Sequence, residues 1–296
     1  MPPSPPTHPP PLLGKQSPLT LIVATTPIPS SSASPSAKTR LGIGLNGTLP
    51  WPRIKTDMSF FARVTTRPPA SVPGSTNAIV MGRKTYDSVP AGLRPLGKRL
   101  SVILSRGGEG GKGGLGERVR GDLERKLNKE REQLEQKKQH TEIQGQTQGQ
   151  GQAQSQSQSQ SNTPESKEEQ PGKQTSAHIS TSLPLALETL SQPPSTTGLP
   201  KLGHVYIIGG AEIYASALNL PATQPVRIVM TNVEKLNPGE TFDCDTFFPV
   251  DEELEQERGW RKVGVQEVSA WVGEEVTGEW KEEGDVRVRM VGYERV

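Results

Sequence analysis

Five short runs of apolar and β-branched residues constrain the fold of this chain more than any other feature. They are LTLIVA (19–24), NAIVM (77–81), LSVIL (100–104), HVYII (204–208) and RIVMTNV (227–233). Each run has the length and composition of a buried strand, and short helix-forming segments follow several of them. This alternation predicts an α/β fold with a mostly parallel central sheet. Residues 260–296 hold two further runs around a turn, which predict an antiparallel hairpin.

The expected helices are short and flank the sheet. They are predicted at residues 55–64, 82–85, 182–190 and 211–218, from apolar spacing or a glycine that opens the segment. Residues 26–40 and 42–52 are rich in Pro, Ser and Gly, so we expect irregular backbone there.

Residues 107–176 interrupt this pattern. They begin rich in glycine, pass through a charged segment with Leu123, Leu127 and Leu134 on a weak stripe, and end in a Gln/Ser tract. The charged part is compatible with a solvated helix, whereas the Gln/Ser tract has almost nothing to bury. We therefore expect one domain (18–106 and 177–296), a largely disordered low-complexity insertion (107–176) and a disordered Pro-rich tail (1–17).

Charge and cysteine content exclude several classes of protein. The formal net charge is +2, which favours neither nucleic acid nor an anionic membrane as a partner. The single cysteine, Cys244, excludes an internal disulfide and a thiolate metal site, and fits a reducing compartment. No apolar run approaches the roughly 18 residues of a membrane span. We expect a cytoplasmic protein that binds no metal, and a monomer because no ordered apolar surface is left over.

A carboxylate is predicted to face an apolar cleft in LPWPRIKTDMSFF (49–61). Asp57 falls in the first turn of a helix whose apolar side includes Met58 and Phe61. An isolated carboxylate there would ordinarily interact with the helix dipole. The neighbouring Pro-Trp-Pro loop favours instead a carboxylate that forms two hydrogen bonds with an amidine-like ring edge, and burial would raise its pKa.

Two basic strand-to-helix turns are candidates for phosphate binding. GRKT (82–85) follows the second strand, and Ser105-Arg106 follows the third. Basic residues at turns are often only solvated, but open α/β sheets bind ligands at the carboxyl ends of neighbouring strands. IIGGAEIY (207–214) is compatible with a tight turn or with a backbone that approaches a pyrophosphate. It is not the GxGxxG fingerprint, so an ordinary Rossmann domain is not indicated.

Together these segments resemble dihydrofolate reductase. The resemblance is carried, in the family's order, by LIVA, GIGLNGTLPWP with the D and FF that follow it (Asp57 and Phe60-Phe61), IVMGRKTYDSVP, RPLGKRLSVILSR, VYIIGGAEIY, RIVMTNV and DTFFP. It implies the family's three-layer fold, NADPH as the cofactor, 7,8-dihydrofolate as the substrate and inhibition by antifolates such as methotrexate. The implied reaction transfers a hydride from nicotinamide C4 to pteridine C6, with protonation of N5.

The resemblance also implies which residues bind the substrate. Asp57 would bind the pteridine 2-amino group and N3, supported by Thr231 through a network that includes water. Arg99 resembles the arginine that binds the α-carboxylate of the glutamate tail. Leu49 and Trp51, in a mobile loop over residues 42–51, would border the reacting rings. The other implied contacts are Ile22, Val23, Ala24, Met58, Phe61, Val89, Leu96, Ile208 and Tyr214.

For the cofactor, Gly209 and Gly210 resemble the family's glycine pair, which is joined there by a cis peptide. Basic and hydroxyl side chains would hold the phosphates: Arg83, Lys84, Thr85, Ser105 and Arg106. Within that set, Arg83 and Arg106 would lie near the 2′-phosphate, which selects NADPH over NADH. The remaining implied contacts are Ala24, Ile43, Gly47, Gly82, Leu104, Ile208, Ala211, Glu212, Ile213 and Tyr214.

The chain also departs from the family's pattern. Residues 26–40 form a longer loop than the family usually has, and Thr181 stands where many relatives carry a further basic residue near the cofactor. The insertion at 107–176 follows a cofactor-binding strand, so an effect on NADPH affinity stays open. No fused thymidylate synthase is expected.

Two other interpretations compete with this one. A pyrimidine reductase of riboflavin synthesis shares the fold and NADPH, but is expected to lack both the Pro-Trp loop and the helix aspartate. A non-catalytic interaction protein would act through the Pro-rich arm, the charged segment and the Gln/Ser tract. Deleting residues 107–176 separates the last case, because an enzyme should keep reductase activity whereas an interaction protein would lose its partner.

Overall fold

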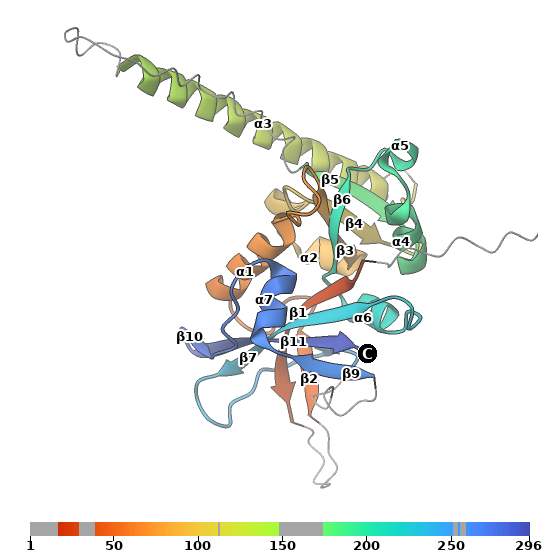
Figure 1. Ribbon diagram of the computed structural model, residues 1–296, viewed down its shortest axis with the longest axis vertical. Coiled ribbons are helices and arrows are strands. Elements are labelled where there is room, and N and C mark those ends of the chain that lie inside the picture. Colours follow the sequence, from red (N-terminus) through yellow and green to blue (C-terminus); the bar gives the residue numbers. More distant parts are fainter. Residues whose placement is uncertain (1–16, 30–38, 112, 148–173, 251–253, 255–258) are drawn as a thin grey trace, which may run out of the picture.

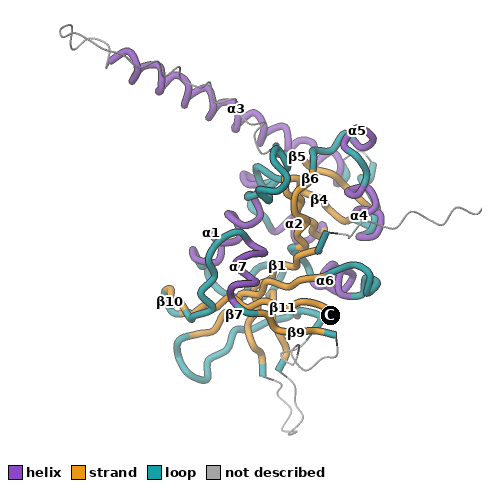
Figure 2. Tube along the Cα trace, viewed as in Figure 1, coloured by secondary structure: helices purple, strands orange, loops and turns teal. Residues whose placement is uncertain are grey.

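The computed structural model describes residues 17–29, 39–111, 113–147, 174–250, 254 and 259–296. A β-sheet forms the middle of the molecule, and one long helix runs away from it (Figure 1, Figure 2). The expectations for the tail at 1–16, for residues 30–38 and for the Gln/Ser tract from residue 148 to 173 lie outside the described residues.

The central sheet has the strand order β10-β11-β7-β1-β6-β3-β4-β5. Its parallel part comprises β1 (Leu19–Ile28), β3 (Thr76–Gly82), β4 (Leu100–Leu104), β5 (Ser176–Ser180), β6 (Leu202–Ile207) and β7 (Val226–Lys235). The antiparallel strands are β2 (Arg40–Gly44), β8 (Thr246–Phe247), β9 (Trp260–Val263), β10 (Lys281–Glu283) and β11 (Val286–Arg295). The predicted mostly parallel sheet with a C-terminal antiparallel hairpin is confirmed.

Helices cover both faces of the sheet and make three layers. Successive strand residues point to opposite faces, so Leu21 and Val23 of β1 pack in one core and Ile22 packs in the other. The first core is closed by α4 (Leu183–Ser191) and α6 (Ala211–Leu218). The second is closed by α1 (Lys55–Thr66), α2 (Arg83–Ser88), α7 (Val265–Val272) and the start of α3 (Leu115–Thr147). A 3₁₀ turn, η1 (Ala91–Leu93), and the short α5 (Pro194–Thr197) lie in connections.

Residues 260–296 differ from the expectation of two long strands. Only β11 is long, and the chain between β9 and the short β10 forms α7. Val265, Val268 and Val272 recur at helical spacing there, and the last two are buried in the second core. Helical periodicity therefore outweighs the β-branched composition of this segment.

β2 and β5 are strands where the sequence pattern predicts none. β2 pairs with an extension of β1 that reaches Ile28. A side chain at Gly42 would collide with the side chain of Cys244, so a glycine is needed where β2 passes that residue. β5 contains few apolar residues, and its parallel pairing with all of β4 stabilises it as an edge strand.

The structure differs from the expected disorder of residues 107–176 in the first part of that segment. Residues 115–147 form α3, whose beginning is packed and not solvated: Leu115 and Val119 are buried in the second core. From residue 131 to residue 140 every side chain is exposed. Figure 1 shows this part of α3 running outward. Across the described residues, no helix combines the length and the apolar character needed to cross a bilayer.

Candidate active site

The first turn of α1 is fixed from a distant hairpin. Its N-cap residue, Ile54, offers no side-chain acceptor. The carboxylate of Glu283, on β10, instead accepts hydrogen bonds from the backbone N–H groups of Lys55 (2.5 Å) and Thr56 (2.9 Å). A carboxylate at this end satisfies orphan donors and complements the helix dipole. Glu283 therefore holds the turn that carries Asp57, a role that nothing in the surrounding sequence indicates.

Asp57 lies half-buried beside β7. Its carboxylate is hydrogen-bonded to the hydroxyl of Thr231, which is buried and pairs with Ala24 across β1 and β7. Burial raises the pKa of Asp57; the hydrogen bond from Thr231 opposes this rise, and the negative charge of Glu283 adds to it. The structure thus brings together the two polar residues assigned to one network, and leaves the carboxyl easier to protonate than a solvated one.

One face of α1 presents three different groups in a row. Asp57, Phe61 and Thr65 follow one another at intervals of four residues, so they share a face over about 12 Å. Arg99 donates a hydrogen bond to the hydroxyl of Thr65, and its guanidinium carbon lies 5.8 Å from the centre of the Phe61 ring. A carboxylate therefore stands at one end, an aromatic ring in the middle and a guanidinium group at the other end.

Arg99 is a buried cation, 6% exposed, that forms no ion pair with any described residue. Its Nε donates to the carbonyl oxygen of Gly97 at 2.9 Å. Burial lowers the pKa of Arg99 to about 10, so the group remains charged at neutral pH. A buried charge is costly unless it is paired, and a guanidinium group suits the two oxygens of a carboxylate. Arg99 is therefore available to form an ion pair with an anionic group of a ligand.

Most apolar residues assigned to the substrate lie under α1. Ile22, Phe61, Leu96 and Ile208 belong to the second core or pack against it. Val23 does not join them, because its side chain packs in the first core on the opposite face of the sheet. On the side of the sheet where Ile22 lies, Val23 can therefore offer a ligand only its backbone atoms and not its side chain.

Two large apolar side chains assigned to the substrate remain exposed. Met58 is 39% exposed and Leu49 is 49% exposed, whereas Val89 is half-buried. Trp51 is buried and packs edge-on against Phe242, with ring centres 6.0 Å apart. Exposed apolar side chains of this size suit a surface that a ligand covers, and Met58 is the sequence neighbour of the half-buried Asp57.

The turn at residues 82–85 and the turn at Gly209 and Gly210 were both assigned to the cofactor. They follow the carboxyl ends of the neighbouring strands β3 and β6. The N–H of Gly82 donates to the carbonyl oxygen of Gly209 at 2.8 Å. A Cβ at Gly210 would lie 3.4 Å from the hydroxyl of Thr85, and one at Gly82 would lie 3.3 Å from Ile213. The peptide between Gly209 and Gly210 is cis, as the resemblance implies. The glycines therefore leave little room for side chains between these turns, where both helices begin.

Tyr214 connects the two halves of the site. It is buried, its hydroxyl donates to the carbonyl oxygen of Ile22 at 2.7 Å, and its ring lies against Gly209. Burial raises the pKa of Tyr214 far above its ordinary range, so the phenol stays protonated and keeps donating. Ile43 and Leu104, also assigned to the cofactor, pack in or against the first core beside Tyr214, and Ala24 packs against Trp51 and its neighbours.

The basic side chains assigned to the phosphates are solvent-facing. Arg83 and Lys84 are exposed and form no ion pair with a described residue, and Ser105 is half-buried. Arg106 lies 3.9 Å from Glu212 of α6, with both side chains largely in solvent. This donor set, beside the glycine backbone, fits an anionic, phosphate-bearing cofactor. Groups of three or more His, Cys, Asp or Glu side chains that could hold a metal do not occur among the described residues.

The loop at residues 42–51 turns tightly at its tip. Asn46 (φ 51°) and Gly47 (φ 76°) adopt left-handed backbone, and Leu45 and Thr48 exchange two backbone hydrogen bonds. The carboxylate of Asp245 accepts from the N–H of Asn46 at 2.7 Å, which lowers the pKa of Asp245. Asp245 belongs to the DTFFP motif, which signalled the family but not this contact.

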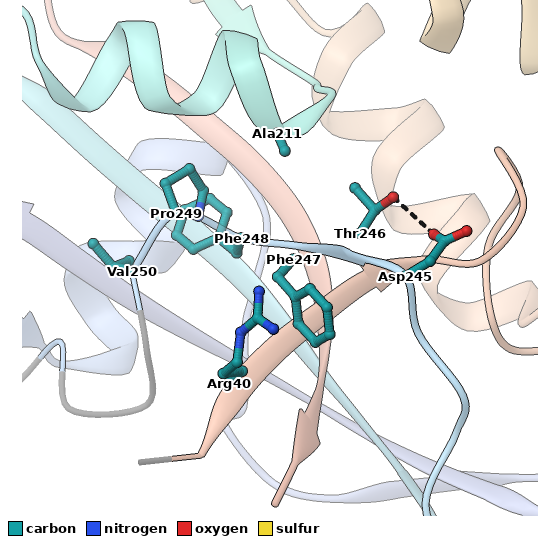
Figure 3. Close-up of a pocket in the computed structure, with 8 residues that line it drawn as sticks. All are labelled: Arg40, Ala211, Asp245, Thr246, Phe247, Phe248, Pro249 and Val250. Carbon is teal, nitrogen blue, oxygen red and sulfur yellow. Dashed lines mark hydrogen bonds between the residues drawn. The ribbon is translucent and has the colours of Figure 1, made fainter. Parts of the chain in front are cut away.

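A cavity of about 520 Å³ opens beside Asp245 (Figure 3). Its wall includes Arg40, whose guanidinium carbon lies 3.4 Å from the centre of the Phe247 ring, and Asp245, whose carboxylate accepts from Thr246 at 2.8 Å. Ala211, the first residue of α6, is its one member assigned to the cofactor. The cavity therefore adjoins the cofactor side and is separate from the face of α1.

Comparison with known proteins finds chains of similar sequence and fold. A family model described as dihydrofolate reductase matches residues 36–145. The dihydrofolate reductase of Cryptococcus neoformans is 28% identical over 277 residues, covering 86% of this chain and 91% of that protein. The enzyme of Pneumocystis carinii is 27% identical over 275 residues, covering 92% and 94% of the two chains. Dihydrofolate reductase from Schistosoma mansoni superposes with a TM-score of 0.51 at 22% identity, covering 95% of this chain and all of that one.

The structural likeness establishes a dihydrofolate-reductase-like fold, built on a mostly parallel central sheet. The sequence matches agree with this fold. The chain is similar in sequence to dihydrofolate reductases, both to the family model over residues 36–145 and to the two fungal enzymes at 27–28% identity.

Proposed function

We propose that this protein reduces 7,8-dihydrofolate to 5,6,7,8-tetrahydrofolate with NADPH. The observation that carries the proposal is the face of α1, with Asp57, Phe61 and Arg99 in that order. Dihydrofolate presents matching groups in the same order: an amidine-like edge of the pteridine, an aminobenzoyl ring and a glutamate carboxylate. Each group meets the chemistry that binds it, namely a carboxylate, an aromatic ring and a guanidinium group.

The pteridine end is held by Asp57 together with Thr231. The carboxylate accepts from the 2-amino group and N3, while the Thr231 hydroxyl keeps its orientation. Ile22 and Ile208 supply the apolar surface for the ring, and Leu49 and Trp51 border it from the loop. Antifolates such as methotrexate bind in the same place, because they carry the same amidine-like edge.

The cofactor takes the edge of the sheet where β3 and β6 end. Gly209 and Gly210 let it approach the backbone, and Thr85 and Ser105 offer hydroxyl donors to its phosphates. Arg83 and Arg106 bind the 2′-phosphate, which favours NADPH over NADH. For Arg106, this requires release from Glu212, a mostly solvated pair of small energy.

The chain itself contributes orientation and proton supply. The bound nicotinamide provides the hydride. Tyr214 contacts both Ile22 of β1 and Gly209 after β6, so it holds the strand that lines the substrate against the turn that binds the cofactor. The pteridine and nicotinamide rings can therefore meet in a fixed geometry. Asp57 favours the protonated substrate because it is the carboxyl group next to the pteridine, and water delivers the proton to N5.

The activity is tested by following NADPH absorbance with purified protein and dihydrofolate, with and without methotrexate. We expect a loss of absorbance that methotrexate abolishes. NADPH binding without turnover would refute dihydrofolate as the substrate, and would direct attention to the pyrimidine substrate of riboflavin synthesis.

The role of Asp57 is tested with Asp57→Asn. The amide keeps the shape but cannot hold the charge, so kcat/KM should fall by about 10²–10⁴-fold. The dissociation constant for NADPH, measured by fluorescence quenching, should stay within about twofold, because Asp57 lies on the substrate side. Unchanged turnover would contradict the proposed role.

A further inference from the structure

The helix α3 falls outside the motifs that carry the family resemblance, yet it packs against parts of the candidate site. Its beginning lies against η1 and β5, and Leu115 and Val119 pack in the second core. Between them, η1 and β5 flank the six-residue segment Arg94–Arg99, which we call the tail loop. This loop contains Leu96, leads into Arg99, and joins η1 to β4.

Asp122 of α3 holds the first end of the tail loop. It is 4% exposed, and its Oδ2 accepts a hydrogen bond from the hydroxyl of Tyr86 at 2.9 Å. The same oxygen lies 3.5 Å from Nε of Arg94, and its other oxygen pairs with Arg125. A buried carboxylate is tolerated only when its partners stay in place, so Asp122 fixes Tyr86 and Arg94 together.

Arg94 is held from a second side as well. Its guanidinium carbon lies 5.4 Å from the centre of the Tyr86 ring, and its Nη1 lies 3.6 Å from the carboxylate of Asp87. Arg118 of α3 pairs with the same Asp87 at 2.9 Å. A cavity of about 530 Å³ opens here between α3 and η1, but each of its arginines already has a carboxylate partner. The cluster is therefore suited to hold the loop and not to bind an anion.

Glu130 of α3 holds the second end of the tail loop. Its carboxylate accepts from the hydroxyl of Thr175 at 2.9 Å, and that buried hydroxyl accepts from the backbone N–H of Lys98 at 2.7 Å. Ser176, the next residue, donates its N–H to the carbonyl oxygen of Arg99 at 3.3 Å. Asp122 and Glu130 are eight residues apart, about 12 Å along α3, and they secure the loop before Leu96 and after it.

We propose that Asp122 and Glu130 are positioning residues that set the tail loop, and with it Leu96 and Arg99, for the aminobenzoyl-glutamate end of the substrate. The inference rests on the proposed function and deepens it. The helix that follows β4 acts on specificity for the substrate's tail and not on the chemistry at the pteridine. Loosening either contact lets Arg99 leave the geometry in which it meets the glutamate carboxylate, while Asp57 and Thr231 are unaffected.

The test compares two substrates in Asp122→Asn and Glu130→Gln. Dihydrofolate carries the tail, and 6-methyl-7,8-dihydropterin lacks it. We expect KM for dihydrofolate to rise about tenfold in each variant, the effect of losing one charge-assisted contact, with kcat within about twofold. Values of kcat/KM for the dihydropterin should match those of the unaltered protein. Glu132→Gln, an exposed change on the same helix, is the matched control and should change neither substrate.

The outcomes separate the two proposals. Equal losses for both substrates, or no change in KM for dihydrofolate, would overturn the positioning role. Absence of turnover in the unaltered protein with both substrates would overturn the proposed function itself. If Asp122→Asn fails to fold, Tyr86→Phe removes a single partner of that carboxylate, and it should show the same selective rise in KM at smaller size. No selective rise in Tyr86→Phe and in Glu130→Gln would refute the inference.

Discussion

At the scale of single residues, Asp57 shows how the site sets the chemistry of a side chain. Burial is the main cause of its raised pKa, and the hydrogen bond from Thr231 only partly offsets it. Glu283 binds the first turn of α1 and also repels the charge on Asp57. The same hairpin thus places the carboxyl group and makes its ionisation less favourable.

A raised pKa has a consequence for stability that can be measured. A carboxyl group whose pKa is higher in the folded state stabilises the fold fully below its unfolded pKa, and this contribution is lost as pH rises through the folded pKa. At pH 7 the ionised Asp57 therefore destabilises the ligand-free protein, whereas an amide does not. We expect Asp57→Asn to melt about 2–4 °C higher at pH 7, the shift that ~1 kcal/mol produces in a domain of this size.

The control for this prediction is pH itself. As the pH falls from 7 toward 4, more of the Asp57 carboxyl group becomes protonated in the folded protein because its pKa is raised, so the difference in melting temperature should shrink. Differential scanning fluorimetry across this range measures it. A constant difference at every pH would show that ionisation of Asp57 is not the cause.

The sequence was sufficient to name Asp57, Thr231 and Arg99 as candidate site residues, because they stand in the motifs that carry the family resemblance. It could not predict Glu283, whose role depends on a hairpin brought to α1 from over 200 residues away. Nor could it place the side chain of Val23, because only the strand's register decides which residues face α1.

At the scale of elements, α3 changes character along its length. Leu115 and Val119 are buried at its beginning, whereas Leu134 is 54% exposed. The weak stripe of Leu123, Leu127 and Leu134 indicated a helix, but it did not indicate the side that is buried. Anchoring depends on Tyr86 and Arg94, which are remote in sequence, so no local pattern reveals it.

This contrast gives a matched pair of substitutions. Leu115→Ala should lower the free energy of unfolding by about 2–5 kcal/mol, since it removes a buried side chain from the second core. Leu134→Ala should change it by less than about 0.5 kcal/mol. Urea denaturation measures both, and equal effects would contradict the packed beginning of α3.

At the scale of the whole molecule, the described residues form one three-layer body from which the later part of α3 projects. The fold class and most strands follow from the alternation of buried runs and short helices. The bounds of the domain do not, because α3 belongs by its composition to the low-complexity segment and by its packing to the core. Deleting residues 107–176 would therefore remove structure as well as the Gln/Ser tract.

A sharper deletion replaces residues 131–173 with a four-residue Gly/Ser linker, which can span up to about 14 Å. Glu130 contacts Thr175, so the two ends need no rearrangement to be joined. Because a shorter loop costs about 0.6 kcal/mol less for each halving, the free energy of unfolding should stay the same or rise. Reductase activity should persist, and its loss, measured by NADPH absorbance, would show that the removed segment is needed for catalysis.

The contact between Glu130 and Thr175 makes this position a natural graft point. A guest protein with neighbouring termini, spliced in place of residues 131–173, would be attached at both ends beside the tail loop. Strain from the guest would reach Lys98 through the hydrogen bond to the Thr175 hydroxyl. A guest that changes shape when it binds its own ligand would therefore change the affinity of the reductase for dihydrofolate. The hydrogen bond that fixes the tail loop in this protein thus marks a position for a biosensor of the guest's ligand. Its readout would be the growth of a cell that depends on this reductase.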